Sequence, residues 1–205
     1  MIALALTVLI QGPMAMTITL DGKRLGEASL KQSIQEDKRK VIEMRTEIKG
    51  PDGKALITRV ETQYDLSGQP LRKFMEMTRP NERYRRTVIV TFDKAGANVV
   101  LQENGKRQTK SVALVPSAPR ANEAELWFIR TKPRVGAKIQ AYNFNLDTLS
   151  WELETIQYSG PKLLKSNGHE VKVHEIRSEK TVVYLDEKGL PYVILYGRIK
   201  LERKP

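Results

Sequence analysis

The sequence contains no cysteine. This absence excludes disulfide bonds, thiol nucleophiles, cysteine-ligated zinc and a lipid-modified N-terminal cysteine. The sequence also lacks the nucleophile motif of serine hydrolases, the zinc-binding motif of metalloproteases and the phosphate-binding Walker loop. Its 13 glycines stand singly at turns, which is typical of hairpins and not of a loop that cradles phosphate. We therefore predict a protein that is not an enzyme and needs no cofactor.

Long hydrophobic runs are also scarce, and the one exception is MIALALTVLI at residues 1–10. The run is too short to cross a bilayer as a helix, which takes about 20 residues. It resembles the apolar region of a signal peptide, and Ala15 lies near a suitable cleavage point, although the usual basic segment is missing. We expect residues 1–15 to be a signal-peptide remnant of a periplasmic or otherwise extracytoplasmic protein. The alternative is a first buried strand.

The charge of the chain is strongly positive. Lysine and arginine number 35 against 24 aspartate and glutamate residues, which gives a net charge of +11 over 205 residues. Such a charge attracts anionic lipid head groups, nucleic acid or acidic proteins, and it says nothing about the fold. The length suits a single all-β domain, which we place at residues 16–205.

Turn signals recur regularly along the chain, and the short runs between them alternate between apolar and polar residues. Residues 26–35 and 41–49 show this period of two, which is the pattern of a strand with one wet face. Glycine, asparagine and aspartate at the turns tolerate the positive φ that tight hairpins need, and Asn104-Gly105 fits a type I′ turn. The sequence therefore predicts an antiparallel meander, sandwich or barrel.

Two features that could indicate a binding site have simpler structural interpretations. His169 and His174 are five residues apart in a predicted strand, so they point to opposite faces and do not share a metal ion. The stretch RPNERYRR, residues 79–86, combines arginine with an aromatic residue as single-strand binders do. Glu82 interrupts it, however, and we interpret it as a solvated hairpin end. We predict no metal site and no nucleic-acid partner.

One segment, residues 117–136, breaks the strand pattern. Asn122 and Glu125 form a capping-box-like helix start, and Pro133 limits the end. We therefore predict a short, mostly apolar helix near residues 122–129, containing Leu126, Trp127 and Phe128. This helix or a second sheet layer would cover one face of the C-terminal strand PYVILYGRIK, and Gly197 would mark where that strand bends or leaves its cover.

Several predicted inward positions carry small or weakly polar residues, namely Ala28, Thr46, Thr58 and Thr62. A β-layer lined in this way leaves room inside, whereas bulky residues would fill it. The predicted helix would then be a plug or lid over an apolar cavity. The alternative is that its aromatic residues complete a packed core.

The C-terminal half carries the clearest likeness to a known family, in WFIRTKPRVGAKIQAYNF, WELETIQYSG, NGHEVKVHEI and TVVYLDEKGLPYVILYGRIKLER. The shared positions are Arg130, Pro133, Gly136, Asp186, Gly189, Leu190 and Pro191. The chain resembles bacterial periplasmic proteins of unknown function with a lipoprotein-carrier-like (LolA-like) fold. This resemblance implies a strongly curved antiparallel sheet, or half-open β-barrel, that wraps a helix. The better-known carriers of this shape bind lipid or acyl chains in the concave face, and there are no family catalytic residues to carry over.

We therefore expect an all-β protein with one short helix that serves as a non-enzymatic cell-envelope protein. It would bind a lipid-like ligand and lie near anionic membrane surfaces. The residues expected to line or close the cavity are Leu126, Trp127, Phe128, Tyr142, Phe144, Tyr192 and Tyr196. The alternative is a structural module with a filled core whose strand edges or basic face bind an envelope protein. A basic nucleic-acid-binding protein is a third hypothesis, against which the signal-like N-terminus argues.

Overall fold

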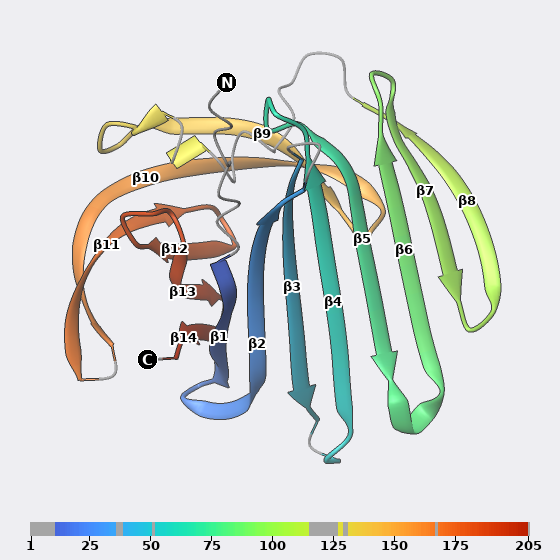
Figure 1. The fold of residues 1–205 in the computed structure, drawn as a ribbon, viewed down its shortest axis with the longest axis horizontal. Coiled ribbons are helices and arrows are strands. Elements are labelled where there is room, and N and C mark those ends of the chain that lie inside the picture. The colour runs from blue at the N-terminus through green and yellow to red at the C-terminus, as the bar shows by residue number, and fades with distance from the viewer. Residues whose placement is uncertain are drawn as a thin grey trace, which may run out of the picture.

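The computed structural model describes residues 11–35, 39–50, 52–114, 127–128, 131–166 and 168–204. Figure 1 shows these residues arranged almost entirely as strands, with one 3₁₀ turn at Pro80–Glu82. The strands are β1 (Gln11–Leu20), β2 (Lys23–Ile34), β3 (Lys40–Lys49), β4 (Ala55–Tyr64), β5 (Pro70–Arg79), β6 (Tyr84–Phe92), β7 (Gly96–Glu103), β8 (Lys106–Ala113), β9 (Lys138–Asn145), β10 (Ser150–Ser166), β11 (His169–Arg177), β12 (Thr181–Leu185), β13 (Pro191–Tyr196) and β14 (Ile199–Arg203).

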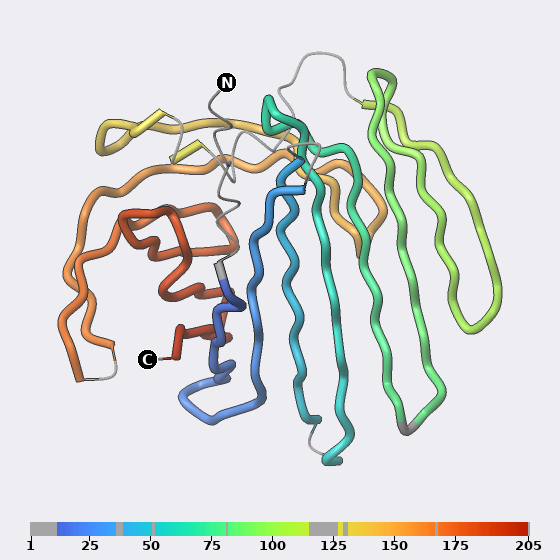
Figure 2. The backbone as a smooth tube through the Cα atoms, in the orientation of Figure 1, coloured from blue at the N-terminus to red at the C-terminus, as the bar shows by residue number. Residues whose placement is uncertain are grey.

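All fourteen strands belong to one antiparallel sheet, in the order β8-β7-β6-β5-β4-β3-β2-β1-β14-β13-β12-β11-β10-β9. Two meanders, β1–β8 and β9–β14, are joined in the middle of the sheet by the pairing of the first strand with the last. Met16 is opposite Arg203 in this pairing, and Lys204 N donates to Ala15 O at 2.9 Å. Figure 2 shows this junction of the blue and red ends of the chain. The expected all-β antiparallel fold is confirmed.

The predicted turn chemistry accounts for the connections. Asn104 and Gly105 have φ of 49° and 86°, as a type I′ turn requires, and they join β7 to β8. The stretch RPNERYRR is a hairpin end, as predicted, because β5 ends at Arg79 and β6 begins at Tyr84. Strand β1 begins at Gln11, and Gln11, Met14 and Ala15 pair with β2 in this structure. The prediction of a signal-peptide remnant over residues 1–15 stays a prediction.

The sheet is not closed by hydrogen bonds, because β8 and β9 lie at opposite ends of the strand order. It curls instead, and in Figure 1 the β9–β10 hairpin runs across the view near the upper ends of β2 to β5. Phe144 of β9 packs there against strands β5–β7. We call this cluster the hairpin core, and its buried residues are Met75, Val88, Val90, Ala97, Val99 and Phe144. The face of β4–β8 that bears this cluster is called the inner face below.

Two expectations about the C-terminal half need adjustment. Residues 191–203 form two strands and not one, because Gly197, with φ of 57°, and Arg198 make a turn between β13 and β14. The predicted helix at residues 122–129 falls mostly outside the described residues. Trp127 and Phe128 are described and have helical backbone, and Lys132 N donates to Phe128 O at 3.2 Å. Within the described part of the chain, no helix has the length and apolar character needed to cross a membrane.

Candidate functional site

The residues predicted to line one cavity lie in separate places. Phe144 belongs to the hairpin core, whereas Phe128 stacks near Tyr158, with ring centroids 5.3 Å apart. Tyr192 lies under the guanidinium of Arg203, 4.9 Å from its ring centroid. Trp127 is buried, Tyr142 is half-buried, Tyr196 is 53% exposed, and Leu126 lies outside the described residues. The described members of the set thus lie against different neighbours, and the prediction that they line one cavity stays a prediction.

The inner face of β5–β8 is filled by aromatic side chains from the hairpin. Phe144 contacts Phe92 edge-on, with centroids 5.9 Å apart at an interplanar angle of 72°, and it contacts Trp151 at 5.1 Å and 86°. Edge-to-face pairs at such distances contribute beyond the burial of their area. Trp151 also donates from Nε1 to Val112 O at 3.5 Å. The hairpin thus occupies this part of the concave space with protein side chains.

Polar contacts lie on either side of the hairpin core. Lys73 Nζ of β5 donates to Asn143 Oδ1 of β9 at 2.7 Å. Arg86 of β6 donates from Nη2 to Asp147 O, in the turn after β9, at 3.3 Å. The two cations therefore hold two points of the hairpin against the sheet, with the apolar cluster between them.

The small residues expected to leave room inside do lie together. Ala28, Thr46 and Thr58 are directly opposite one another across β2, β3 and β4. Thr62 and Tyr64 follow Thr58 on the same face of β4, since they share its parity, and both are buried. The Tyr64 hydroxyl is buried, and it has no hydrogen-bond partner among the described residues. An unsatisfied buried hydroxyl is uncommon and marks a position where a water molecule or a ligand group would be favourable.

Lys73 adjoins this row, because it is opposite Thr62 in the β4–β5 pairing. Burial lowers the pKa of its ammonium group to about 8, and the charge of Glu154 opposes the shift only in part. No carboxylate of the described residues forms an ion pair with Lys73, whose hydrogen-bond partner is the neutral amide of Asn143. A desolvated lysine of this kind is a candidate for binding an anionic group.

We predict that Lys73→Met raises the free energy of unfolding by about 1–2 kcal/mol at pH 7, because it removes a poorly compensated charge from the interior. The folded pKa is about 8 and the unfolded value is 10.5. Between these values the unfolded chain binds a proton that the folded chain does not, so wild-type stability rises with pH. The advantage of the variant should therefore fade across this window. Urea unfolding of both proteins at a series of pH values measures this difference.

The matched control for that experiment is Lys172→Met, because Lys172 is an exposed lysine on β11. Its stability should stay close to that of the wild type at every pH. A Lys73→Met variant that is less stable than the wild type at pH 7, or whose advantage does not change with pH, would contradict the desolvated state of Lys73.

A second cluster joins an aromatic pair to a histidine. The Tyr158 hydroxyl and His174 Nδ1 are 2.8 Å apart, and the Phe128 ring centroid is 4.8 Å from that of His174. Burial raises the pKa of the Tyr158 hydroxyl. The cluster resembles a packed core with a satisfied polar pair, and His169 lies outside it at the start of β11. Among the described residues, no group of three or more potential metal ligands is present.

Glu175 of β11 is a buried carboxylate, only 1% exposed. Lys162 Nζ lies 3.0 Å from its Oε2, and Arg177 donates to its Oε1. Burial by itself raises the pKa of this carboxyl, but the hydrogen bonds and charges of Arg177 and Lys162 outweigh it and hold the pKa at about 2. Because both cations are about half exposed, this cluster is best explained as structural pairing between β10 and β11.

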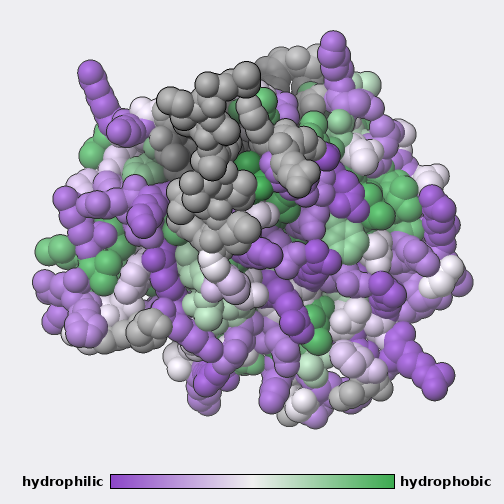
Figure 3. Space-filling view, viewed as in Figure 1, coloured by the Kyte–Doolittle hydropathy of each residue, from purple (hydrophilic) through white to green (hydrophobic). Residues whose placement is uncertain are grey.

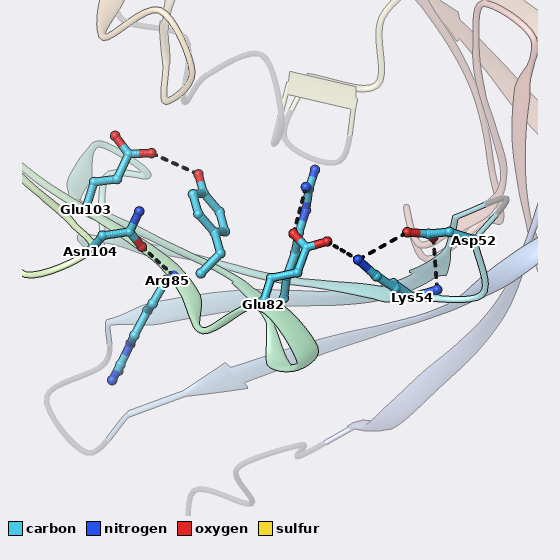
Figure 4. Close-up of polar contacts among 8 residues, drawn as sticks. Asp52, Lys54, Glu82, Arg85, Glu103 and Asn104 are labelled. Carbon is cyan, nitrogen blue, oxygen red and sulfur yellow. Dashed lines mark hydrogen bonds and ion pairs between the residues drawn. The ribbon is translucent and has the colours of Figure 1, made fainter.

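Two shallow depressions lie on the surface of the described residues. A groove of about 460 Å³ lies beside the β3–β4 connection and the β5–β6 turn, and another of about 280 Å³ lies beside Glu152 and Lys180. Figure 4 shows Lys54 of the first groove between Asp52 and Glu82, with Nζ 2.8 Å from Glu82 Oε1. Arg79 also pairs with Glu82, at 3.2 Å. The charges of this groove thus neutralise one another.

Comparison with known proteins shows the fold of the chain and gives no information on its activity. No protein-family model matches the sequence, and no curated protein matches it. The crystal structure of a β-barrel-like protein of domain of unknown function DUF1849 from Brucella abortus is similar, with a TM-score of 0.60 and 11% identity over 95% of this chain and 96% of that chain. A DUF1089 family protein from Pseudomonas aeruginosa has a TM-score of 0.39 and 15% identity, covering 93% and 94%.

The first of these likenesses shows that the chain has a β-barrel-like fold. It agrees with the likeness to proteins of unknown function that the sequence predicted. The finer likeness to lipoprotein carriers remains a prediction. Lys73, Tyr64, Tyr158 and His174 were not among the predicted site residues. The one sequence signal for Lys73 is its place between Leu71, Met75 and Met77, the apolar residues that share its parity on β5.

Proposed function

We propose that the protein is a non-enzymatic module of the bacterial cell envelope that binds another protein through its strand edges and basic surface. This is the filled-core hypothesis. The observation that supports it is the hairpin core, in which Phe144 and Trp151 take up the part of the inner face where an apolar ligand would lie. A periplasmic or otherwise extracytoplasmic location is part of the proposal.

The surface also supports this proposal. On the face shown in Figure 3, hydrophilic side chains predominate and hydrophobic ones appear as separate small patches. Membrane and lipid-binding surfaces usually present a larger contiguous apolar patch. The net charge of +11 favours an acidic partner.

The test is native mass spectrometry of protein purified gently from its own cells, combined with titration of an apolar fluorescent dye. We expect the mass of the bare polypeptide and no enhancement of dye fluorescence, because a filled core offers no apolar cavity. The same spectrum gives the start of the mature chain. A lipid-sized adduct together with dye binding would contradict the proposal.

That contrary result would support a second candidate, a half-open barrel that wraps the predicted helix and carries a lipid-like ligand. The observation in its favour is the pair of interior polar groups, Lys73 without a carboxylate partner and Tyr64 without a hydrogen-bond partner among the described residues. An anionic lipid head group would satisfy both. In this candidate, Trp127 and Phe128 would close the site, and their double replacement by alanine would reduce the lipid content.

A further inference from the structure

Strand β8 is an edge of the sheet, since β7 is its one strand neighbour among the residues that the structure describes. Leu114 N donates to Ala95 O at 3.0 Å. In the register of the β7–β8 pairing, this bond means that the even-numbered residues of β8 direct their backbone groups toward β7. In an antiparallel pair, every second residue directs its backbone N–H and C=O away from the partner. On β8 these residues are Arg107, Thr109, Ser111 and Ala113. In the described part of the chain, no hydrogen bond to these outward groups is present.

The side chains of β8 are accessible and carry charge of one sign. Residues 106–111 are all exposed. Lys106, Arg107 and Lys110 are its charged residues, and none of them has an ion-pair partner among the described carboxylates. Lys110 makes one long contact to Leu149 O, at 3.5 Å. Elsewhere on the surface the arginines are commonly paired, as Arg85 is with Glu76.

The positive charge of β8 disfavours pairing with a second copy of the chain and favours pairing with an acidic segment of another protein. If a second copy of the chain paired edge to edge through β8, lysine and arginine would oppose lysine and arginine, which is the usual protection of an edge strand against self-association. An extended segment with acidic residues would instead meet Lys106 and Lys110 on one face of β8 and Arg107 on the other, and it would complete the backbone ladder. Strand addition of this kind takes affinity from main-chain hydrogen bonds and specificity from alternate side chains.

We propose that β8 is the docking edge for an extended acidic segment of a partner protein, which adds to the sheet as a further strand. The inference rests on the proposed function and names the surface and the chemistry of the partner. The outward N–H and C=O groups of Arg107, Thr109 and Ser111 bond to the segment, and the carboxylates at its alternate positions lie near Lys106 and Lys110, which share one face of β8.

The probe for a direct test is a blocked peptide of alternating glutamate and valine, of the eight-residue length of β8. It is titrated into the isotope-labelled full chain, and backbone amide shifts are followed by nuclear magnetic resonance. We expect shifts concentrated on β8 and protection of the Thr109 amide against hydrogen exchange. A peptide with lysine in place of glutamate should not bind. Shifts elsewhere, or no shifts with the acidic peptide, would overturn the inference.

Two variants separate strand addition from simple charge attraction. Thr109→Pro removes one outward N–H but no bond to β7, and an edge strand tolerates proline at such a position. Thr109→Val is its matched control and keeps the N–H. We expect Thr109→Pro and the triple reversal of Lys106, Arg107 and Lys110 to glutamate each to weaken binding at least about tenfold. Equal binding by the two Thr109 variants would overturn strand addition.

Three further outcomes separate this inference from the function on which it rests. If single-stranded DNA displaces the peptide and binds more tightly, the edge is a nucleic-acid site and the inference fails. If an envelope protein cross-links equally to the wild type and to the triple reversal variant, the proposed function stands and β8 is not its surface. A lipid adduct in the native mass spectrum would count against the proposed function itself.

Discussion

Replacing Phe144 with alanine should lower the free energy of unfolding by about 3–5 kcal/mol, the range measured for buried phenylalanine. Phe144 is 2% exposed and contacts both Phe92 and Trp151. The hairpin and the sheet are not joined by strand pairing at this place, since β9 is at the far end of the strand order from β8. The side chain therefore supplies much of the contact that keeps the curled sheet together.

Urea unfolding followed by tryptophan fluorescence measures this loss, because Trp151 reports on the hairpin. Tyr196→Ala is the matched control, since Tyr196 is exposed and its removal should change stability by less than about 0.5 kcal/mol. The Phe144→Ala variant should also bind the apolar dye that the wild type does not bind. A loss of under about 1 kcal/mol would show that the hairpin core is not tightly packed and would favour the ligand-carrier candidate.

Replacing Gly26 with alanine should cost about 3 kcal/mol, at the upper end of the range for overpacking. A Cβ atom at Gly26 would lie 1.9 Å from the carbonyl oxygen of Glu47 and 3.0 Å from Cα of Ile48. These are backbone atoms of β3, so no side chain can rotate away. The β2–β3 ladder must open or shift, and the buried cluster around Ile18, which is opposite Gly26, would be disturbed.

Gly12→Ala is the natural control, because no heavy atom lies within 4 Å of a Cβ built at Gly12. Thermal unfolding of the two variants gives the difference in stability, and hydrogen exchange of the β2 and β3 amides shows where the structure has opened. Equal melting temperatures would mean that the strands separate at little cost. In that case the close approach of β2 and β3 at Gly26 would not be a constraint on the sheet.

The strands were predictable because their signals are local. Alternation over residues 26–35 and 41–49 reports which side of a strand meets water, and the turn at Asn104-Gly105 depends on the φ that those two residues tolerate. The strand end at RPNERYRR followed from the same reasoning. The turn at Gly197 was less clear from sequence, because a glycine within an apolar run is compatible with a bend, a bulge or a hairpin turn.

The site was harder to predict because it depends on contacts between distant strands. Phe144, Tyr192 and Tyr196 look alike in sequence, yet one is in the hairpin core, one is under Arg203 and one faces solvent. Lys73 and Asn143 are 70 residues apart, and only the curl of the sheet brings them together. No short-range sequence pattern indicates a contact between residues so far apart in the chain.

The sequence by itself determined the all-β class, most of the hairpin turns, the lack of cysteine chemistry and the positive charge, because each depends on composition or on neighbours along the chain. The tertiary structure decided that β1 pairs with β14, that the β9–β10 hairpin fills the inner face, and that β8 is left as a cationic edge. Those outcomes depend on how the curled sheet packs against itself. This packing is decided by the burial of side chains from distant strands, so the apolar–polar alternation of any one segment does not reveal it.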